Sequence, residues 1–205
     1  MILGISQRVA VDEKTGEIRD CLDQNWSQLI HNYGHFPIAI PNDPQNLKIF
    51  LENIKIDGII LTGGNDLTSL STGVNVSISR DQTEIDLLSY ASDHKIPVLG
   101  VCRGFQMLNT FLGGTLTRAP GHVGYPHEVT TVNVDFVDSQ SFTVNSFHDY
   151  VIQEDDLAKE FRPLAVAVDG TVESAISSQH NWIGIMWHPE RSVSSLDSII
   201  LKSLF

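Results

Sequence analysis

Short apolar runs alternate with amphipathic segments along most of the chain. Apolar runs typical of buried strands lie at residues 2–6, 36–40, 57–61, 98–101 and 183–187. Segments with apolar side chains at helical spacing lie at residues 21–33, 47–54, 80–95, 105–112 and 193–205. Strands that alternate with helices in this way predict an α/β fold with a doubly wound, mainly parallel sheet and flanking helices.

A different pattern covers residues 129–177. Four stretches alternate apolar with polar residues or are rich in β-branched side chains, at residues 129–136, 142–144, 164–168 and 172–177. Asp169-Gly170, between the last two, is a strong two-residue hairpin turn. We therefore expect a few antiparallel strands near one edge of the sheet. Three polar segments are expected to be loops or turn-rich connections, at residues 7–20, 65–79 and 116–126.

Length and charge narrow the class of protein. The chain has 205 residues, and we expect a single catalytic domain over residues 1–205, long enough to bury a sizeable core. Its formal net charge of −12 argues against nucleic acid or an anionic membrane as a partner. No stretch approaches the ~20 apolar residues that span a bilayer, and the apolar start is too short for a signal peptide. We expect a cytoplasmic protein in which Cys21 and Cys102 stay reduced, and the sequence assigns no role to Cys21.

Cys102 stands where a predicted strand passes into a predicted helix. Gly100 and Gly104 flank it, and small residues are what a sharp strand-to-helix turn requires. Such a turn places the sulfur above the sheet edge and at a helix N-terminus, where the thiolate is favoured over the thiol. Cys102 is therefore a candidate nucleophile, whereas most cysteines are small buried hydrophobes.

His188 and Glu190 supply what a cysteine nucleophile needs. A thiol with a pKa of about 8.5 requires a nearby base, and the base requires an orienting acceptor. Pro189 fixes the backbone between the two side chains. Both follow a predicted buried strand, and the carboxyl ends of parallel strands meet at one edge of a sheet. We therefore expect Cys102, His188 and Glu190 to form a catalytic triad.

Gly63 and Gly64 follow the predicted strand at residues 57–61. Alone, the pair indicates a tight turn, but its position opposite the cysteine strand favours a role in catalysis. We expect the backbone N–H groups of Gly64 and Arg103 to form an oxyanion hole. No cofactor is expected, and the lack of a Walker-type glycine loop argues against nucleotide hydrolysis. No metal site is expected either, because these histidines do not stand with carboxylates at metal-ligand spacing: His31, His35, His94, His122, His127 and His180.

Together these motifs resemble those of the class I glutamine amidotransferase superfamily, and within it the γ-glutamyl hydrolase branch, peptidase family C26. The motifs are G-V-C-R-G-F-Q at residues 100–106, G-G-T-L at 113–116, W-H-P-E at 187–190, L-T-G-G-N-D at 61–66, R-D-x-x-E at 80–84 and V-N-S-F-H at 144–148. The resemblance covers most of the chain, and residues 57–190 most strongly. It implies a flavodoxin-like fold and a γ-glutamyl amide as the small-molecule substrate.

The resemblance also implies a pocket for the γ-glutamyl group. In the family, the residue equivalent to Gln106 contacts that group, and Asn65 lies in the motif that follows the glycines. The family's segment for the glutamyl α-carboxylate and α-amine corresponds to Asn145, Ser146, Phe147 and His148. The chain continues with Asp149-Tyr150, where many relatives have another His or Gln, so a plain hairpin loop stays an alternative for this segment.

Three alternatives stay open for the amine part of the substrate and for the role of the chain. The implied reaction forms a thioester on Cys102 and releases glutamate and an amine. The chain is expected to act alone on a conjugate such as γ-glutamyl-aminobutyrate, or as a glutaminase subunit that hands ammonia to a partner synthase. A regulatory subunit that only binds the ligand is a third alternative, against which the intact triad residues argue.

The N-terminal part favours a nucleotide-linked substrate. It resembles hydrolases of bacterial surface-polysaccharide pathways that cleave γ-glutamyl-CDP-amidate to glutamate and cytidine diphosphoramidate for capsule phosphoramidate. Arg8, Arg19 and Arg80 lie in or beside expected rim loops, where guanidinium groups would hold a pyrophosphate. Trp26 or Tyr33 would stack on the base. The alternative is that these arginines are solvated surface charges.

Overall fold

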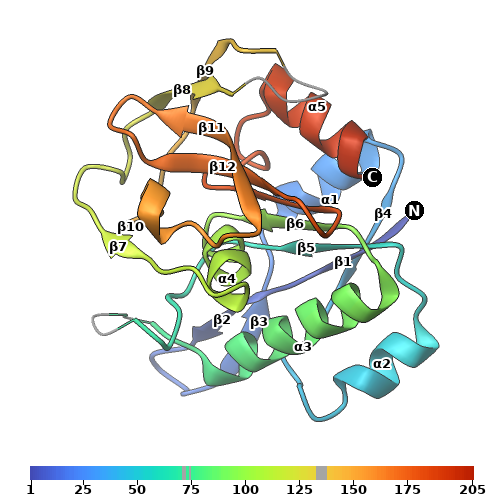
Figure 1. Cartoon of the computed structure of the whole chain (residues 1–205). Helices are drawn as coiled ribbons and strands as arrows, with labels where there is room; N and C mark the ends of the chain where they lie inside the picture. The colour runs from blue at the N-terminus through green and yellow to red at the C-terminus, as the bar shows by residue number, and fades with distance from the viewer. Residues whose placement is uncertain (71–72, 74, 133–137) are drawn as a thin grey trace.

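The computed structural model describes residues 1–70, 73, 75–132 and 138–205. Within them, nine strands form one twisted sheet in the order β4-β1-β5-β6-β13-β12-β11-β8-β9 (Figure 1). The first five strands of this order run parallel: β4 Phe36–Ala39, β1 Ile2–Ile5, β5 Gly58–Leu61, β6 Val98–Val101 and β13 Trp182–Ile185. The other four are antiparallel to their neighbours: β12 Val172–Ser177, β11 Phe161–Ala167, β8 His127–Thr131 and β9 Ser141–Val144.

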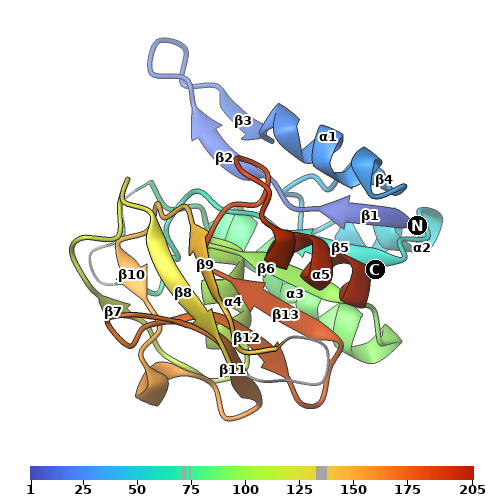
Figure 2. The same ribbon diagram turned by 90° about the horizontal axis from the view of Figure 1, so that it is seen from above.

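Helices cover both faces of the parallel half of the sheet (Figures 1 and 2). The five helices are α1 Gln24–Asn32, α2 Leu47–Asn53, α3 Ile78–His94, α4 Arg103–Phe111 and α5 Ser195–Leu204. One apolar cluster joins α1 and α5 to one face, and a second joins α2, α3 and α4 to the other. The strands between them are buried on both sides, which is why they appear in the sequence as continuous apolar runs.

The predicted doubly wound, mainly parallel sheet with antiparallel strands at one edge is confirmed. The Asp169-Gly170 turn joins β11 to β12 with Gly170 at a φ of 87°. The last residues of the strand expected at 129–136 lie outside the described residues. In the described part of the chain, no helix has both the length and the apolar composition that crossing a bilayer demands.

Two of the segments expected to be loops contain strands. Residues 7–20 include most of an antiparallel hairpin of β2 Arg8–Val11 and β3 Ile18–Cys21, which projects from the rim of the sheet (Figure 2). Residues 116–126 include β7 Thr117–Arg118, which pairs with β10 Tyr150–Val151, and a short 3₁₀ helix follows at Glu154–Asp156. The two strands of the hairpin have four residues each and are largely exposed, so neither carries the longer run of alternating apolar and polar residues by which half-buried strands are predicted.

Candidate active site

Cys102 occupies a strained turn between β6 and α4. Its backbone has φ 52° and ψ −109°, a conformation that residues with a side chain rarely adopt. Cys102 N donates to Ile185 O on the neighbouring strand at 2.7 Å, and Cys102 O accepts from Gln106 N at 3.1 Å, so both sides of the turn are fixed. A side chain at Gly104 would clash with the carbonyl of Leu61 on β5. The tight strand-to-helix turn predicted from the two glycines is therefore present.

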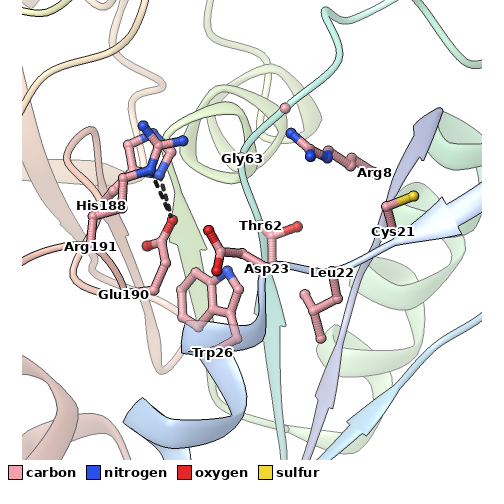
Figure 3. Close-up of a pocket in the computed structure, with 11 residues that line it drawn as sticks. Arg8, Cys21, Leu22, Asp23, Trp26, Thr62, Gly63, His188, Glu190 and Arg191 are labelled. Atoms are coloured by element: carbon pink, nitrogen blue, oxygen red, sulfur yellow. Dashed lines mark hydrogen bonds and ion pairs between the residues drawn. The ribbon is translucent and has the colours of Figure 1, made fainter.

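His188 lies beside Cys102 because their strands are neighbours. Strand β13 pairs with β6 in parallel, with Ile185 opposite Val101, so both chains leave the sheet at the same edge. His188 Nδ1 lies 2.7 Å from Glu190 Oε1, and both side chains are 4 % exposed (Figure 3). His188 Nε2 is buried and has no conventional hydrogen-bond partner among the described residues, which leaves it to the Cys102 sulfur. The three side chains expected to form a triad thus meet at one edge of the sheet.

The pKa values of the two reacting groups favour a thiolate–imidazolium pair. Burial opposes the thiolate, but the contact with His188 and the backbone N–H of Arg103 lower the pKa of Cys102 below its ordinary value. Burial also opposes the charged imidazole, but its contacts with Cys102 and Glu190 raise the pKa of His188 to about 9. At neutral pH these contacts therefore favour a thiolate at Cys102 and a protonated imidazole at His188.

Asn145 holds the backbone of His188. Its Oδ1 accepts from His188 N at 2.8 Å, and its Nδ2 donates to His188 O at 2.9 Å. Both ends of this amide are committed to the protein, so the expected contact of the Asn145 side chain with substrate is corrected to a positioning role. These two hydrogen bonds link the segment after β9 to the segment after β13. They therefore connect the antiparallel part of the sheet to the edge where Cys102 and His188 lie.

Gly63 and Gly64 pass directly beneath the imidazole. A Cβ atom at Gly63 would lie 2.7 Å from His188 Cε1, so only glycine leaves room for the ring. Gly64 has a φ of 82° and lines the cavity that contains Cys102. Its carbonyl accepts a hydrogen bond from Arg80, which turns that oxygen into the protein. The placement fits the expected oxyanion role of the Gly64 N–H.

A buried ion cluster of Arg80, Asp81, Glu84 and Arg103 supports this loop. Arg80 pairs with Glu84 at 3.0 Å, and Arg103 pairs with Glu84 and Asp81. Arg80 Nη2 also donates to the carbonyls of Thr62 at 2.7 Å and Gly63 at 3.1 Å. Arg80 is fully buried in the first turn of α3, so its expected contact with a pyrophosphate is wrong. Its guanidinium fixes the glycine loop instead.

Two cavities open on either side of the catalytic edge. The first, named here the nucleophile cavity, is lined by Cys102, Gln106, Phe147, His148 and Tyr150, among others. The second, the hairpin cavity, is lined by His188, Glu190 and Arg191 together with residues of β2 and the start of α1 (Figure 3). Gly64 borders both cavities. A substrate that reacts at Cys102 would thus place one part on each side of the glycine loop.

The expected substrate-binding residues divide into two groups. Gln106, Phe147 and His148 line the nucleophile cavity. Asn65 borders it too, but its amide is bound to Val9 N at 2.8 Å and Val9 O at 2.9 Å, so it anchors the hairpin. The Ser146 hydroxyl donates to the carbonyl of His122 and is 1 % exposed. The substrate contact expected of the Ser146 side chain is therefore wrong, because the hydroxyl faces the protein interior.

The residues expected to hold a nucleotide also divide. Arg8 lines the hairpin cavity and packs on Gly64, and its guanidinium makes no hydrogen bond or ion pair with the described residues. Arg19 pairs with Asp12 at 3.3 Å and with Glu17 and lies outside both cavities, so the structure does not bring it to the site. Trp26 borders the hairpin cavity but is 1 % exposed in the core, so its faces are not free to stack on a base.

Arg191 is a cavity residue that the sequence did not single out. Its guanidinium carbon lies 4.3 Å from the centre of the Phe147 ring, and its Nε lies 3.8 Å from Glu190 Oε1. It follows the W-H-P-E motif directly, and that adjacency is the signal that would have placed it at the site. Arg8 and Arg191 thus bring two positive charges to the hairpin cavity, which the carboxylates of Asp23 and Glu190 also line.

The expectation about the histidines is also corrected. His122 and His127 come together with His148 and Glu173, and one donor atom from each lies within 4.8 Å of the others. The four residues come from the segment before β8, the start of β8, the segment before β10, and β12. His122 and His127 are only five residues apart, but His148 and Glu173 lie 21 and 46 residues further along the chain, so no short spacing motif could indicate the whole cluster.

Two relatives resemble the chain over most of its length. It is 32% identical over 210 residues to the γ-glutamyl-CDP-amidate hydrolase of Campylobacter jejuni, an alignment that covers 100% of the chain and 98% of the relative. It is 26% identical over 208 residues to the γ-glutamyl-γ-aminobutyrate hydrolase of Escherichia coli O157:H7, covering 85% of the chain and 80% of the relative.

Solved structures share the fold. A putative GMP synthase subunit from Thermoplasma acidophilum matches with a TM-score of 0.71 at 17% identity. The match covers 100% of this chain and 92% of the Thermoplasma chain. A glutamine amidotransferase from Thermotoga maritima matches with a TM-score of 0.65 at 18% identity, and the match covers 92% of this chain and 75% of the Thermotoga chain. The sequence model of the peptidase C26 family matches residues 1–190. The chain therefore belongs to the peptidase C26 family.

Proposed function

We propose that the chain is a γ-glutamyl amide hydrolase whose catalytic residues are Cys102, His188 and Glu190. The observation that carries the proposal is the cysteine in a strained turn beside an imidazole that is hydrogen-bonded to a buried carboxylate. This is the arrangement of nucleophile, base and orienting acceptor that acyl transfer requires. Membership of the peptidase C26 family supports the same reaction class.

The reaction follows from the positions of these groups. The Cys102 thiolate attacks the γ-carbonyl carbon of the glutamyl amide, and the carbonyl oxygen becomes an oxyanion that the N–H groups of Gly64 and Arg103 stabilise. His188 gives its proton to the leaving amine, and the C–N bond breaks to leave a γ-glutamyl thioester on the sulfur. His188 then takes a proton from water, whose oxygen attacks the thioester and releases glutamate and the thiolate.

The two cavities divide the substrate between them. In this proposal the glutamyl group occupies the nucleophile cavity beside Gln106 and His148, and the amine side extends past Gly64 toward the hairpin cavity. Arg8 and Arg191 there would bind an anionic leaving group by charge-assisted hydrogen bonds. A phosphoramidate linked to a nucleotide carries such charges, as in the γ-glutamyl-CDP-amidate named for the Campylobacter relative. We therefore propose that compound as the preferred substrate.

A panel of γ-glutamyl amides tests both parts of the proposal. Glutamate release would be measured with γ-glutamyl-CDP-amidate, glutamine and γ-glutamyl-aminobutyrate. We expect kcat/KM for the nucleotide-linked amide to exceed the other two by about 100-fold, the effect of about two charge-assisted hydrogen bonds. Comparable values for all three would discard the nucleotide part. Cys102→Ala should abolish turnover of every amide, and residual activity above about one part in a thousand would discard Cys102 as the nucleophile.

Two arginines on the same hairpin provide a matched comparison. Arg8→Gln should raise KM for γ-glutamyl-CDP-amidate by about 10-fold and leave KM for glutamine unchanged, since only the former places charge in the hairpin cavity. Arg19→Gln removes the same charge from the hairpin at a position outside both cavities. It should leave both KM values unchanged. Equal effects of the two variants would indicate a general charge effect and contradict the assigned position of the leaving group.

A further inference from the structure

The cluster of His122, His127, His148 and Glu173, named here the histidine cluster, lies next to the nucleophile cavity but is not used by the proposed reaction chemistry. His148 borders both, and the other three residues lie behind it. Glu173 is fully buried, and His122 and His148 are each 4 % exposed, while His127 is half-buried. A group of three imidazoles and a carboxylate so far from water needs a partner that offsets the loss of hydration.

Two buried atoms of the cluster lack such a partner. His148 Nε2 and Glu173 Oε2 make no hydrogen bond with the described residues. His148 Nε2 faces Glu173 Oε1 at 3.7 Å, which is beyond hydrogen-bonding distance. His148 Nδ1 lies 3.1 Å from the carbonyl oxygen of Tyr150 and therefore carries the ring proton of the neutral imidazole. In that form its Nε2 lone pair faces a carboxylate oxygen, a repulsion that a cation between the two atoms, either a proton or a metal ion, would relieve.

The outer contacts of the cluster orient its atoms as in metal sites. His122 Nε2 lies 3.1 Å from Asp169 Oδ2, which turns His122 Nδ1 inward as an acceptor. That atom lies 2.8 Å from His127 Nε2 and 4.0 Å from Glu173 Oε1. Metal-bound histidines commonly donate their other ring N–H to a carboxylate or a backbone carbonyl. Asp169 accepts this bond from His122, and the carbonyl oxygen of Tyr150 accepts it from His148.

We propose that the histidine cluster is a binding site for a divalent transition-metal ion of the Zn²⁺ type. Its ligands would be His122 Nδ1, His127 Nε2, His148 Nε2 and a Glu173 carboxylate oxygen. Tetrahedral zinc with bonds of about 2.0–2.1 Å places its ligand atoms about 3.3 Å apart, and the separations of 2.8, 3.7 and 4.0 Å scatter around that value. Three nitrogen donors favour zinc over Mg²⁺ or Ca²⁺, which prefer oxygen ligands.

Four protein ligands complete a tetrahedral shell, so the ion would have a structural role. It would tie the segment before β8 and strand β12 to the segment that carries Phe147 and His148. That segment forms one wall of the nucleophile cavity. The inference stands on the cluster itself and is independent of the reaction proposed above.

The test is metal binding by the full chain without an affinity tag. The Cys102→Ala background removes the thiol of the nucleophile cavity as a competing ligand. After chelator treatment, titration calorimetry with ZnSO₄ should show about one equivalent bound with a submicromolar Kd. Co²⁺ should give the visible bands of a tetrahedral site with no thiolate charge-transfer band, because the ligands are nitrogen and oxygen. Zinc should also raise the melting temperature of this protein.

Two ligand variants and a control decide the outcome. His127→Gln and Glu173→Gln should each lower zinc affinity by about 100-fold or more and remove the rise in melting temperature. His127 is half-buried, so its variant is the one most readily tolerated by the fold. His94→Gln, at the exposed end of α3, should bind zinc like the parent. No saturable binding at micromolar zinc, or unchanged binding in the ligand variants, would overturn the proposal. It would leave a shared proton as the cation between His148 and Glu173.

Discussion

At the scale of single residues, the site depends on a strained cysteine and a buried His–Glu pair. The positive φ of Cys102 costs on the order of 1–3 kcal/mol, and it persists because the turn is held from both sides by Ile185 and Gln106. The strain aims the sulfur toward His188 at the edge of the sheet. Glu190 then fixes the tautomer of His188 by accepting from Nδ1, which leaves Nε2 to face the sulfur.

The pH profile of catalysis reports on this pair. The thiolate–imidazolium form exists above the lowered pKa of Cys102 and is lost as pH rises through the pKa of His188, about 9. A plot of kcat/KM for glutamate release against pH should therefore be bell-shaped with an alkaline limb near pH 9. Glu190→Gln should move that limb to lower pH, because the carboxylate that helps to raise the pKa of His188 is gone.

A second His–Glu pair serves as the control for this prediction. His180 Nδ1 lies 2.6 Å from Glu160 Oε1, away from both cavities. Glu160→Gln should leave both limbs of the profile where they are. An alkaline limb that stays in place in Glu190→Gln would show that Glu190 does not set the pKa of His188.

At the scale of elements, the buried ion cluster joins helix α3 to the start of α4. Glu84 on α3 contacts both Arg80 and Arg103, and Arg103 is the first residue of α4, next to the nucleophile. Burial alone would raise the pKa of Glu84, but Arg103 and Arg80 lower it, so this carboxylate stays ionised. Its contribution to stability is present above the unfolded pKa of about 4.3 and is lost as pH falls through the lower folded value.

Removing one member of this cluster should be costly. Glu84→Gln leaves two buried guanidinium groups without their shared counter-charge, and we expect the free energy of unfolding to fall by about 3–5 kcal/mol. Denaturant titration followed by circular dichroism would measure it. Glu52→Gln breaks an exposed pair with Lys48 on α2 and should leave the denaturation midpoint unchanged. A loss below about 1 kcal/mol in Glu84→Gln would contradict the role assigned to the cluster.

At the scale of the whole molecule, two parts of one sheet meet at the active site. The parallel part supplies the turn of Cys102 and the end of β13, and the connection after β9 in the antiparallel part supplies Phe147 and His148. Asn145 is the link between them, because its amide makes two hydrogen bonds to the backbone of His188. The position of the imidazole thus depends on an element from the opposite side of the fold.

Cutting that link should affect catalysis more than binding. Asn145→Ala should lower kcat for glutamate release by about 10- to 100-fold, the effect of a displacement of about 1 Å, and change KM little. The rate at which iodoacetamide alkylates Cys102 at neutral pH should fall as well, because the thiolate needs the imidazolium beside it. Asn53→Ala, whose amide bonds only within α2, is the control. An unchanged kcat and alkylation rate in Asn145→Ala would contradict the positioning role.

The sequence predicted that Cys102, His188 and Glu190 meet at one edge of the sheet, because the signals for these three residues are local. The buried strands are continuous apolar runs, and residues such as Cys102 and His188 directly follow such strands. The hairpin of β2 and β3 was missed because its strands are short and largely exposed. The placement of Arg80 was wrong for another reason. Helix α3 begins at Ile78, which puts this charged side chain in the interior beside Glu84, and pairing across a helix interface leaves no local pattern.

The sequence by itself determined the alternation of buried strands with helices, the turn at Cys102 and the edge where His188 and Glu190 emerge, since backbone preference and apolar periodicity act over a few residues. Only the tertiary structure decided which polar side chains face a cavity and which bind the protein's own backbone. Arg8 faces a cavity, whereas Asn145 binds the backbone of His188. It also brought His122, His127, His148 and Glu173 together. Such juxtapositions depend on how distant strands pair, and the free energy that fixes them comes from packing across the sheet.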